Sequence, residues 1–138
     1  MASEALVKRV KEILAIAKSG QVDEAYKLYA EFYLSAEFRT YPMEDQRTAL
    51  KLVVNAKVPP SRPSVALVEA YRAALEPLTE MLGALGEPVD FQLLGICCVV
   101  TGDDKRAGEM FRTGLRLERE RNPQSDLCGS LMKWVAAV

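Results

Sequence analysis

The chain has 138 residues, a length typical of one domain, and hydrophobic residues make up 49% of it. Its 18 basic and 19 acidic residues nearly balance, so no overall positive field would attract nucleic acid or an anionic membrane. Histidine is absent from the sequence, which excludes Ser-His-Asp, Cys-His and mixed His–Cys zinc sites. We therefore expect a protein that is not an enzyme and that holds no metal and no other cofactor.

Membrane and secretion signals are also missing from the pattern. The apolar run LLGICCVV, residues 93–100, is less than half the length of about 20 residues that a membrane helix needs. The start, MASEALVKRVKE, carries charges throughout, unlike a secretory signal. Three cysteines, an odd number, favour reduced thiols over disulfides. These features predict a cytoplasmic protein with no membrane insertion.

Three helices are predicted before a proline-rich break. Apolar residues recur every three or four positions after Ser3, as on one face of a helix that would end near Gly20. A second helix is expected at about 23–35, and a third from Pro42, which suits a first helical turn, to about residue 57. The sequence VPPSRPS, residues 58–64, cannot continue a helix because it contains three prolines.

Four more helices are predicted after this break. The first begins at Ser64 and should kink or end at Pro77, and the others cover about 88–101, 103–121 and 123–136. No stretch alternates with the period of two that is typical of a β-strand. Seven helices joined mostly by short turns predict an all-α, antiparallel helix–turn–helix array. We expect one domain, 1–138, with 1–57 and 64–138 as candidate sub-units.

Large and small residues are regularly spaced between positions 91 and 114. Their pattern is F-x2-L-G-x6-G-x4-A-x3-F, and the residues are Phe91, Leu94, Gly95, Gly102, Ala107 and Phe111. This pattern resembles the tetratricopeptide repeat (TPR), a helix–turn–helix unit of 34 residues. Gly20, Ala25 and Tyr29 repeat the spacing of the last three of these positions. Small residues would let the two helices of a unit approach closely, while large residues would fill the space beside them.

The resemblance to TPR proteins implies a right-handed superhelix that holds a protein or peptide in a concave groove. The first helix of each repeat would line this groove. The positions are Val7, Val10, Lys11 and Leu14 on the first predicted helix, and Val89, Gln92, Leu93, Ile96 and Val99 on the helix at 88–101. They lack the Lys and Asn residues with which many TPR proteins bind a terminal carboxylate. We expect an apolar groove, lined by Val7, Val10, Leu14 and Tyr33, which the helix of Trp134 either caps or partly fills.

Six of the ten aromatic residues lie close together in the sequence, between positions 26 and 41. Tyrosine is favoured both in interfaces and at the wet edges of cores, so two interpretations remain open: packing against the next helix, or a surface for a partner. Together with three residues of the first helix, four of these aromatics form the candidate partner-binding set. The full set is Val7, Val10, Leu14, Tyr26, Tyr33, Phe38 and Tyr41.

Other polar and cysteine clusters favour structural interpretations. Cys97 and Cys98 have no basic neighbour and are expected in the core. The pairs Asp23-Glu24, Glu44-Asp45 and Asp103-Asp104 each fall at a predicted helix start, where carboxylates cap free amides. A basic stripe of Lys105, Arg112, Arg116 and Arg119 could meet an acidic partner, but a solvated face is the favoured interpretation.

We therefore predict a non-catalytic adaptor or scaffold that binds a partner segment through an apolar groove. Small bacterial secretion chaperones also use three TPR-like units, so a client-holding chaperone remains an alternative. A homo-oligomeric structural component is a further alternative, in which self-association would bury the apolar surface.

Overall fold

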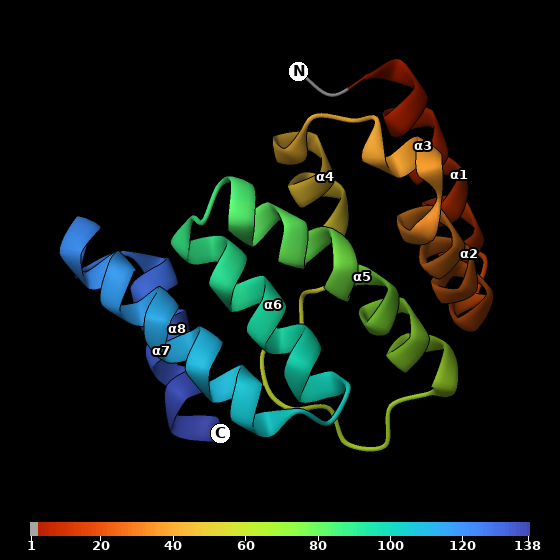
Figure 1. Ribbon diagram of the computed structural model, residues 1–138. Coiled ribbons are helices and arrows are strands. Elements are labelled where there is room, and N and C mark those ends of the chain that lie inside the picture. Colours follow the sequence, from red (N-terminus) through yellow and green to blue (C-terminus); the bar gives the residue numbers. More distant parts are fainter. Residues whose placement is uncertain (1–2) are drawn as a thin grey trace.

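The computed structural model describes residues 3–138, and within them every regular element is a helix. The prediction of an all-α fold is confirmed. Figure 1 shows the eight helices of this region. They are α1 (Glu4–Lys18), α2 (Val22–Leu34), α3 (Ala36–Arg39), α4 (Met43–Leu50), α5 (Val65–Ala84), α6 (Pro88–Val100), α7 (Asp104–Arg121) and α8 (Asp126–Ala137).

The long helices pack in the order in which they follow one another in the chain. α1 packs on α2, α2 on α5, and then α5 on α6, α6 on α7 and α7 on α8. In Figure 1 the array runs from α1 and α2 on the right to α7 and α8 on the left. The chain between α4 and α5 passes behind α6 in this view. Short turns between consecutive helices favour this arrangement, because each helix can bury its apolar face against the one before it.

Polar residues define the helix starts as the sequence predicts. The side chains of Ser3, Ser64 and Asp103 accept backbone N–H groups at the starts of α1, α5 and α7. The other two acidic pairs, Asp23-Glu24 and Glu44-Asp45, lie in the first turns of α2 and α4. The last helix differs from the prediction, because it starts at Asp126 with Ser125 as its cap, and not at residue 123.

The structure corrects the prediction of one helix from Pro42 to about residue 57. α4 ends at Leu50, and Val53 and Val54 lie in irregular chain. Both valines are buried and β-branched, and β-branched residues are stiff in a helix and pack well elsewhere. The short helix α3, which the sequence analysis missed, is held by Ser35, whose hydroxyl accepts the N–H of Phe38 at 3.2 Å.

Pro77 does not end α5, which continues to Ala84. Proline inside a helix removes one hydrogen bond and costs about 3 kcal/mol. Ala74 and Leu78 on either side of it are fully buried, and Pro77 is itself buried. Packing of this face against the neighbouring helices offsets the local cost, so the local rule fails here.

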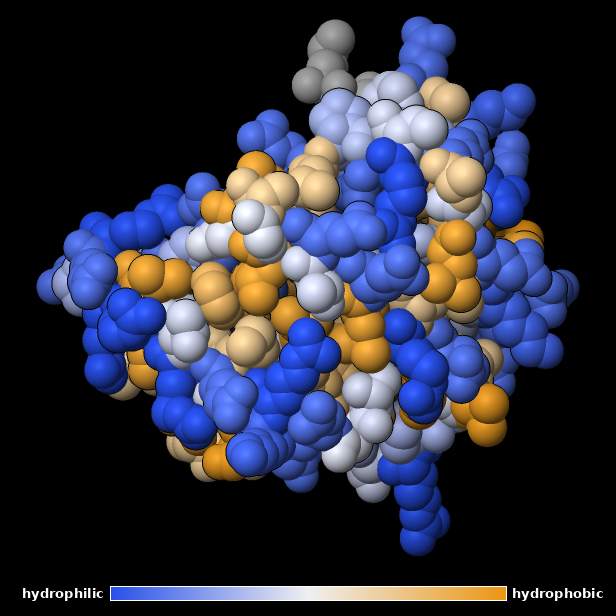
Figure 2. Space-filling view, in the orientation of Figure 1, coloured by the Kyte–Doolittle hydropathy of each residue, from blue (hydrophilic) through white to orange (hydrophobic). Residues whose placement is uncertain are grey.

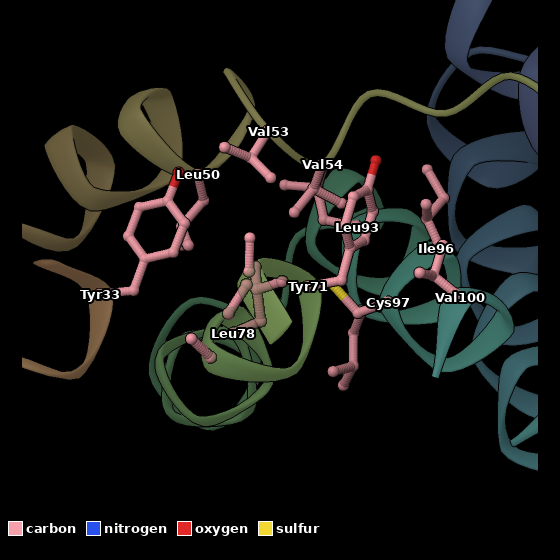
Figure 3. Packing of buried hydrophobic residues seen from close by; sticks show 14 of the residues in the cluster. Tyr33, Leu50, Val53, Val54, Tyr71, Leu78, Leu93, Ile96, Cys97 and Val100 are labelled. Carbon is pink, nitrogen blue, oxygen red and sulfur yellow. The ribbon is translucent and has the colours of Figure 1, made fainter. Parts of the chain in front are cut away.

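One connected core extends across the proline-rich segment. It includes Leu6 of α1 and Trp134 of α8, and the buried valines between α4 and α5 join it in the middle. Figure 3 shows Val53 and Val54 between Leu50 and the α6 residues Leu93 and Ile96. The candidate sub-units 1–57 and 64–138 therefore share this core.

Candidate functional site

An apolar groove of about 260 Å³ lies between α1 and α4. Val7, Val10 and Leu14 of α1 form one wall, and Ala49 and Leu52 lie on the opposite wall. The surface inside the groove is entirely apolar. Val7 is 38% exposed and Leu52 is 40% exposed, so solvent reaches both walls. Apolar side chains that gather in an open concave site are typical of a place where another apolar group binds.

The helical register of α1 explains the first wall. Leu6 and Ile13 are buried in the core, at 3% and 1% exposure. Val7, Val10 and Leu14 follow them at helical spacing on the adjoining flank, which leaves them at the edge of the core. The structure places these three residues in one groove with residues of α4 and with Leu52. Their role in binding a partner stays a prediction.

Polar contacts with α2 and with the chain just before α4 hold α4, the second wall. The hydroxyl of Tyr33 on α2 donates to the carbonyl of Ala49 at 3.0 Å. The Gln46 side chain donates to the carbonyl of Tyr41 at 2.8 Å. The carbonyl of Ala49, at the C-terminal end of α4, also accepts the N–H of Leu52 at 3.3 Å, so the Tyr33 hydroxyl is its second donor. These hydrogen bonds hold the second wall in place.

A buried ion pair attaches α4 to α6. The guanidinium of Arg47 meets both carboxylate oxygens of Asp90, each at 2.7 Å. Asp90 is fully buried and also accepts the N–H of Glu87 at the start of α6. The hydrogen bonds to Asp90 raise the pKa of Arg47, so this cation stays charged. These contacts give the pair a structural role, since paired buried charges must keep both partners.

The structure corrects the expectation that Tyr33 lines the groove. Tyr33 and Phe38 are fully buried and Tyr41 is 8% exposed, while Tyr26 on α2 is half-buried. The rings of Tyr33 and Phe38 lie 5.3 Å apart in an edge-to-face arrangement. Of the two interpretations of the aromatic cluster, packing therefore describes Tyr33, Phe38 and Tyr41. The reason is that each ring fills space between α2, α3 and α4.

The predicted repeat positions bring α6 and α7 close together. A Cβ atom added at Gly95 would lie 2.6 Å from the ring of Phe111, and Gly102 turns the chain with a φ of +91°. Leu94, Ala107 and Phe111 are fully buried. The half-buried Phe91 lies against Gly114, where an added Cβ would come within 3.0 Å of it.

A second hollow, of about 410 Å³, lies along α6. The predicted groove positions Val89, Gln92, Leu93 and Ile96 line it, together with Trp134 and the chain from Val54 to Lys57. The chain after α4 thus covers part of this face. Trp134 also stacks on Phe111, with ring centroids 5.1 Å apart, so α8 covers the end of the array.

The surroundings of Cys97 and Cys98 disfavour the reactive thiolate form of both side chains. Both are buried, and desolvation raises the pKa of each thiol, that of Cys97 strongly. A raised pKa lowers the fraction of thiolate, which is the nucleophilic form. Within residues 3–138, no three Cys, Asp or Glu side chains group closely enough to hold a metal ion.

No helix in the described part of the chain is both long and apolar enough to span a membrane. The chain matches no family model, no curated protein and no solved structure.

Sequence reasoning missed Leu52, Ala49, Arg47 and Asp90. The only signal for the first two was apolar character inside a wrongly predicted helix, and nothing local marks the ion pair.

Proposed function

We propose that this protein is a non-catalytic, TPR-like interaction module that binds an apolar segment of a partner protein in the groove between α1 and α4. The observation that carries this proposal is the entirely apolar groove with exposed Val7 and Leu52 on opposite walls. Apolar burial supplies about 25 cal/mol for each Å² removed from water, so such a groove favours a complementary apolar surface.

The charged rims suggest how the partner segment would be oriented. Lys11 lies on the α1 side of the groove and Asp45 on the α4 side. A partner helix with an apolar face, an acidic flank and a basic flank would match both rims in one orientation. The occupant we propose is such an amphipathic helix, since its apolar face fits a groove between two helices.

Several features support the TPR-like and adaptor parts of the proposal. Gly95 lies close to Phe111 and Gly102 turns the chain between the two helices, which are features the resemblance requires. The groups best suited to chemistry are occupied or buried: Asp90 is paired with Arg47, and the thiols are in the core. The free, buried cysteines fit a reducing compartment, and we propose the cytoplasm.

The test is affinity capture, in which variants of this protein serve as baits. The variants differ only in the position at which an apolar residue becomes acidic. Val10→Asp and Leu52→Asp change the two walls of the groove, and Val65→Asp makes the same chemical change at a residue that is 79% exposed on α5. We expect a partner that the unchanged protein and Val65→Asp both retain and that both groove variants lose. Circular dichroism melts control for folding.

A photo-crosslinking residue at Lys11, on the groove rim, then tests the contact directly. The same residue at Lys27, which is exposed on α2, is the control position. Crosslinks to the partner from Lys27 but not from Lys11 would contradict the groove assignment, as would retention of the partner by both groove variants. Light scattering tests the alternative of self-association. In that case the unchanged protein would have the mass of a homo-oligomer, and Val10→Asp would dissociate it. A client that is soluble only with this protein would favour the chaperone.

A further inference from the structure

A cleft of about 570 Å³ lies between α7 and α8, separate from the groove described above. Its apolar lining comes from Leu115, which is 8% exposed, and from the half-buried Val135. Arg112, Arg116 and Arg119 form its rim, and Glu120 lies at one end. The cleft thus combines an apolar floor with a row of exposed guanidinium groups.

These three arginines have no partner within the described residues. Within residues 3–138, they make no ion pair and no side-chain hydrogen bond, although Glu109 and Glu120 lie on the same helix. Other arginines do pair, and they are Arg9, Arg39, Arg47, Arg72 and Arg121. Arg62, Arg106 and the lysines of residues 3–138 form no ion pair either, so what distinguishes Arg112, Arg116 and Arg119 is their position in one row beside an apolar cleft.

The glycine at position 108 makes room for the first of these guanidinium groups. A Cβ atom at Gly108 would lie 2.9 Å from a terminal nitrogen of Arg112. The Arg112 side chain therefore leans back over the preceding turn of α7, as long helical side chains do. This contact keeps its charge near the helix surface at the rim of the cleft.

The spacing of the rim predicts the shape of its ligand. Arg112, Arg116 and Arg119 lie four and three residues apart, so they follow one side of α7 over about 10 Å at 1.5 Å per residue. Carboxylates spaced three or four residues apart on a second helix would meet them in register. Apolar side chains between those carboxylates would meet Leu115 and Val135.

We propose that this cleft is a second binding site, which takes an acidic amphipathic helix of a protein partner. Charge complementarity selects acidic side chains, and the apolar floor selects a helix over a polyanion such as nucleic acid. This site does not depend on the α1–α4 groove.

The test uses fluorescence anisotropy with a labelled helix-forming peptide. The peptide carries Glu at positions i, i+3 and i+7 with Leu between them, and a second peptide carries Gln in place of Glu. We expect the Glu peptide to bind about tenfold more tightly than the Gln peptide, and its binding to weaken as salt screens the charges. Equal binding of the two peptides, or no binding of either, would overturn the proposal.

Matched variants locate the site. The triple change Arg112→Glu, Arg116→Glu and Arg119→Glu should weaken binding at least about tenfold, since it reverses each rim charge. The triple change Lys8→Glu, Lys18→Glu and Lys27→Glu alters the net charge equally on α1 and α2 and should leave affinity within about twofold. If both triple variants lose affinity for the Glu peptide equally, the binding depends on the overall charge of the protein and not on this cleft. If charge reversal unfolds the protein, the three Arg→Gln changes provide the same comparison.

A finer variant acts on position without changing charge. Gly108→Ala should keep the fold, because alanine favours a helix, but its methyl group should displace Arg112 and weaken the Glu peptide about threefold. Unchanged affinity in this variant would contradict the position assigned to Arg112. A 15-nucleotide single-stranded DNA serves as the polyanion probe. If this DNA binds more tightly than the Glu peptide, the proposal that the partner is a protein is wrong.

Discussion

The helix pair α6–α7 and the segment from α4 to Val54 both pack on the same core, but through different kinds of contact. In the α6–α7 pair, Gly95 lies under the ring of Phe111, and small residues let the helices approach. The α4 segment also buries Leu50, Val53 and Val54, but it adds polar contacts: the Tyr33 hydroxyl at Ala49, the Tyr71 hydroxyl at the adjoining Asn55, and the Arg47–Asp90 pair. Figure 3 shows both hydroxyls directed toward this segment.

This difference indicates how each region should respond to change. Close packing tolerates lost polar groups but not added volume, because a filled core has no room for another side chain. A segment held by buried polar contacts responds in the opposite way, because each lost partner leaves a desolvated group behind. Figure 2 shows hydrophobic and hydrophilic surface interleaved over the face where α5, α6 and α7 lie in front.

The largest effect should come from Arg47→Ala. This change leaves the fully buried Asp90 without its cation, and breaking a buried pair on one side costs about 3–5 kcal/mol of unfolding free energy. Urea unfolding measures the loss. The control is Arg72→Ala, whose ion pair with Glu69 is exposed and should cost less than about 1 kcal/mol. Equal losses would mean that α4 is not held by this pair.

The next largest effect should come from Gly95→Leu. The new side chain would collide with the ring of Phe111, since even a Cβ lies 2.6 Å from it, and overpacking costs about 1–3 kcal/mol. Thermal and urea melts check this expectation. In Gly83→Leu nothing lies within 4 Å of the new Cβ, and the free energy of unfolding should stay level or rise. If the Gly95→Leu protein is as stable as the unchanged protein, α6 and α7 do not approach each other as closely as described.

A smaller loss is expected in Tyr33→Phe. The carbonyl of Ala49 would lose the Tyr33 hydroxyl at 3.0 Å and keep the N–H of Leu52 at 3.3 Å, so the cost should not exceed about 1 kcal/mol. Hydrogen exchange should rise in α4 more than in α6–α7, because the lost bond belongs to the α4 segment. Tyr26→Phe is the control, since Tyr26 is half-buried. Uniform exchange across the chain would contradict the separate anchoring of the α4 segment.

The smallest effect should appear at alkaline pH. Burial raises the pKa of Cys97 above its ordinary value of 9.0, and those of Tyr33 and Tyr71 above 10.0. The unfolded chain therefore loses these protons first, so stability is complete below pH 9.0 and falls as pH rises above it. Urea melts across this range measure the slope, and Cys97→Ala should reduce it. A stability that rises with pH would contradict these directions.

Much of the helical array can be predicted from residues that are close together in the sequence. Apolar spacing in α1 places Leu6 and Ile13 in the core and Val7, Val10 and Leu14 at its edge. The groove was therefore half predictable. Its other wall was not, because the position of Ala49 and Leu52 depends on where α4 ends, and the predicted helix ran on to about residue 57.

The failures have one physical origin. Pro77 should break a helix by its own chemistry, but buried neighbours on α5 offset that cost. The basic residues Arg112, Arg116 and Arg119 of α7 are exposed, as the sequence analysis favoured, but only the structure places Leu115 and Val135 beside them. Periodicity reports which face of an element is apolar, and it carries no information about which element will cover that face.

The sequence by itself determined that the chain is all-helical, where most helices begin, and that α6 and α7 meet at glycine. These features rest on interactions within a few turns of helix, whose partners are close in the chain. Only the tertiary structure decided the end of α4, the burial of Tyr33 and Phe38, and the pairing of Arg47 with Asp90. Those features join residues that are far apart in sequence, so their energies exist only once the core has assembled.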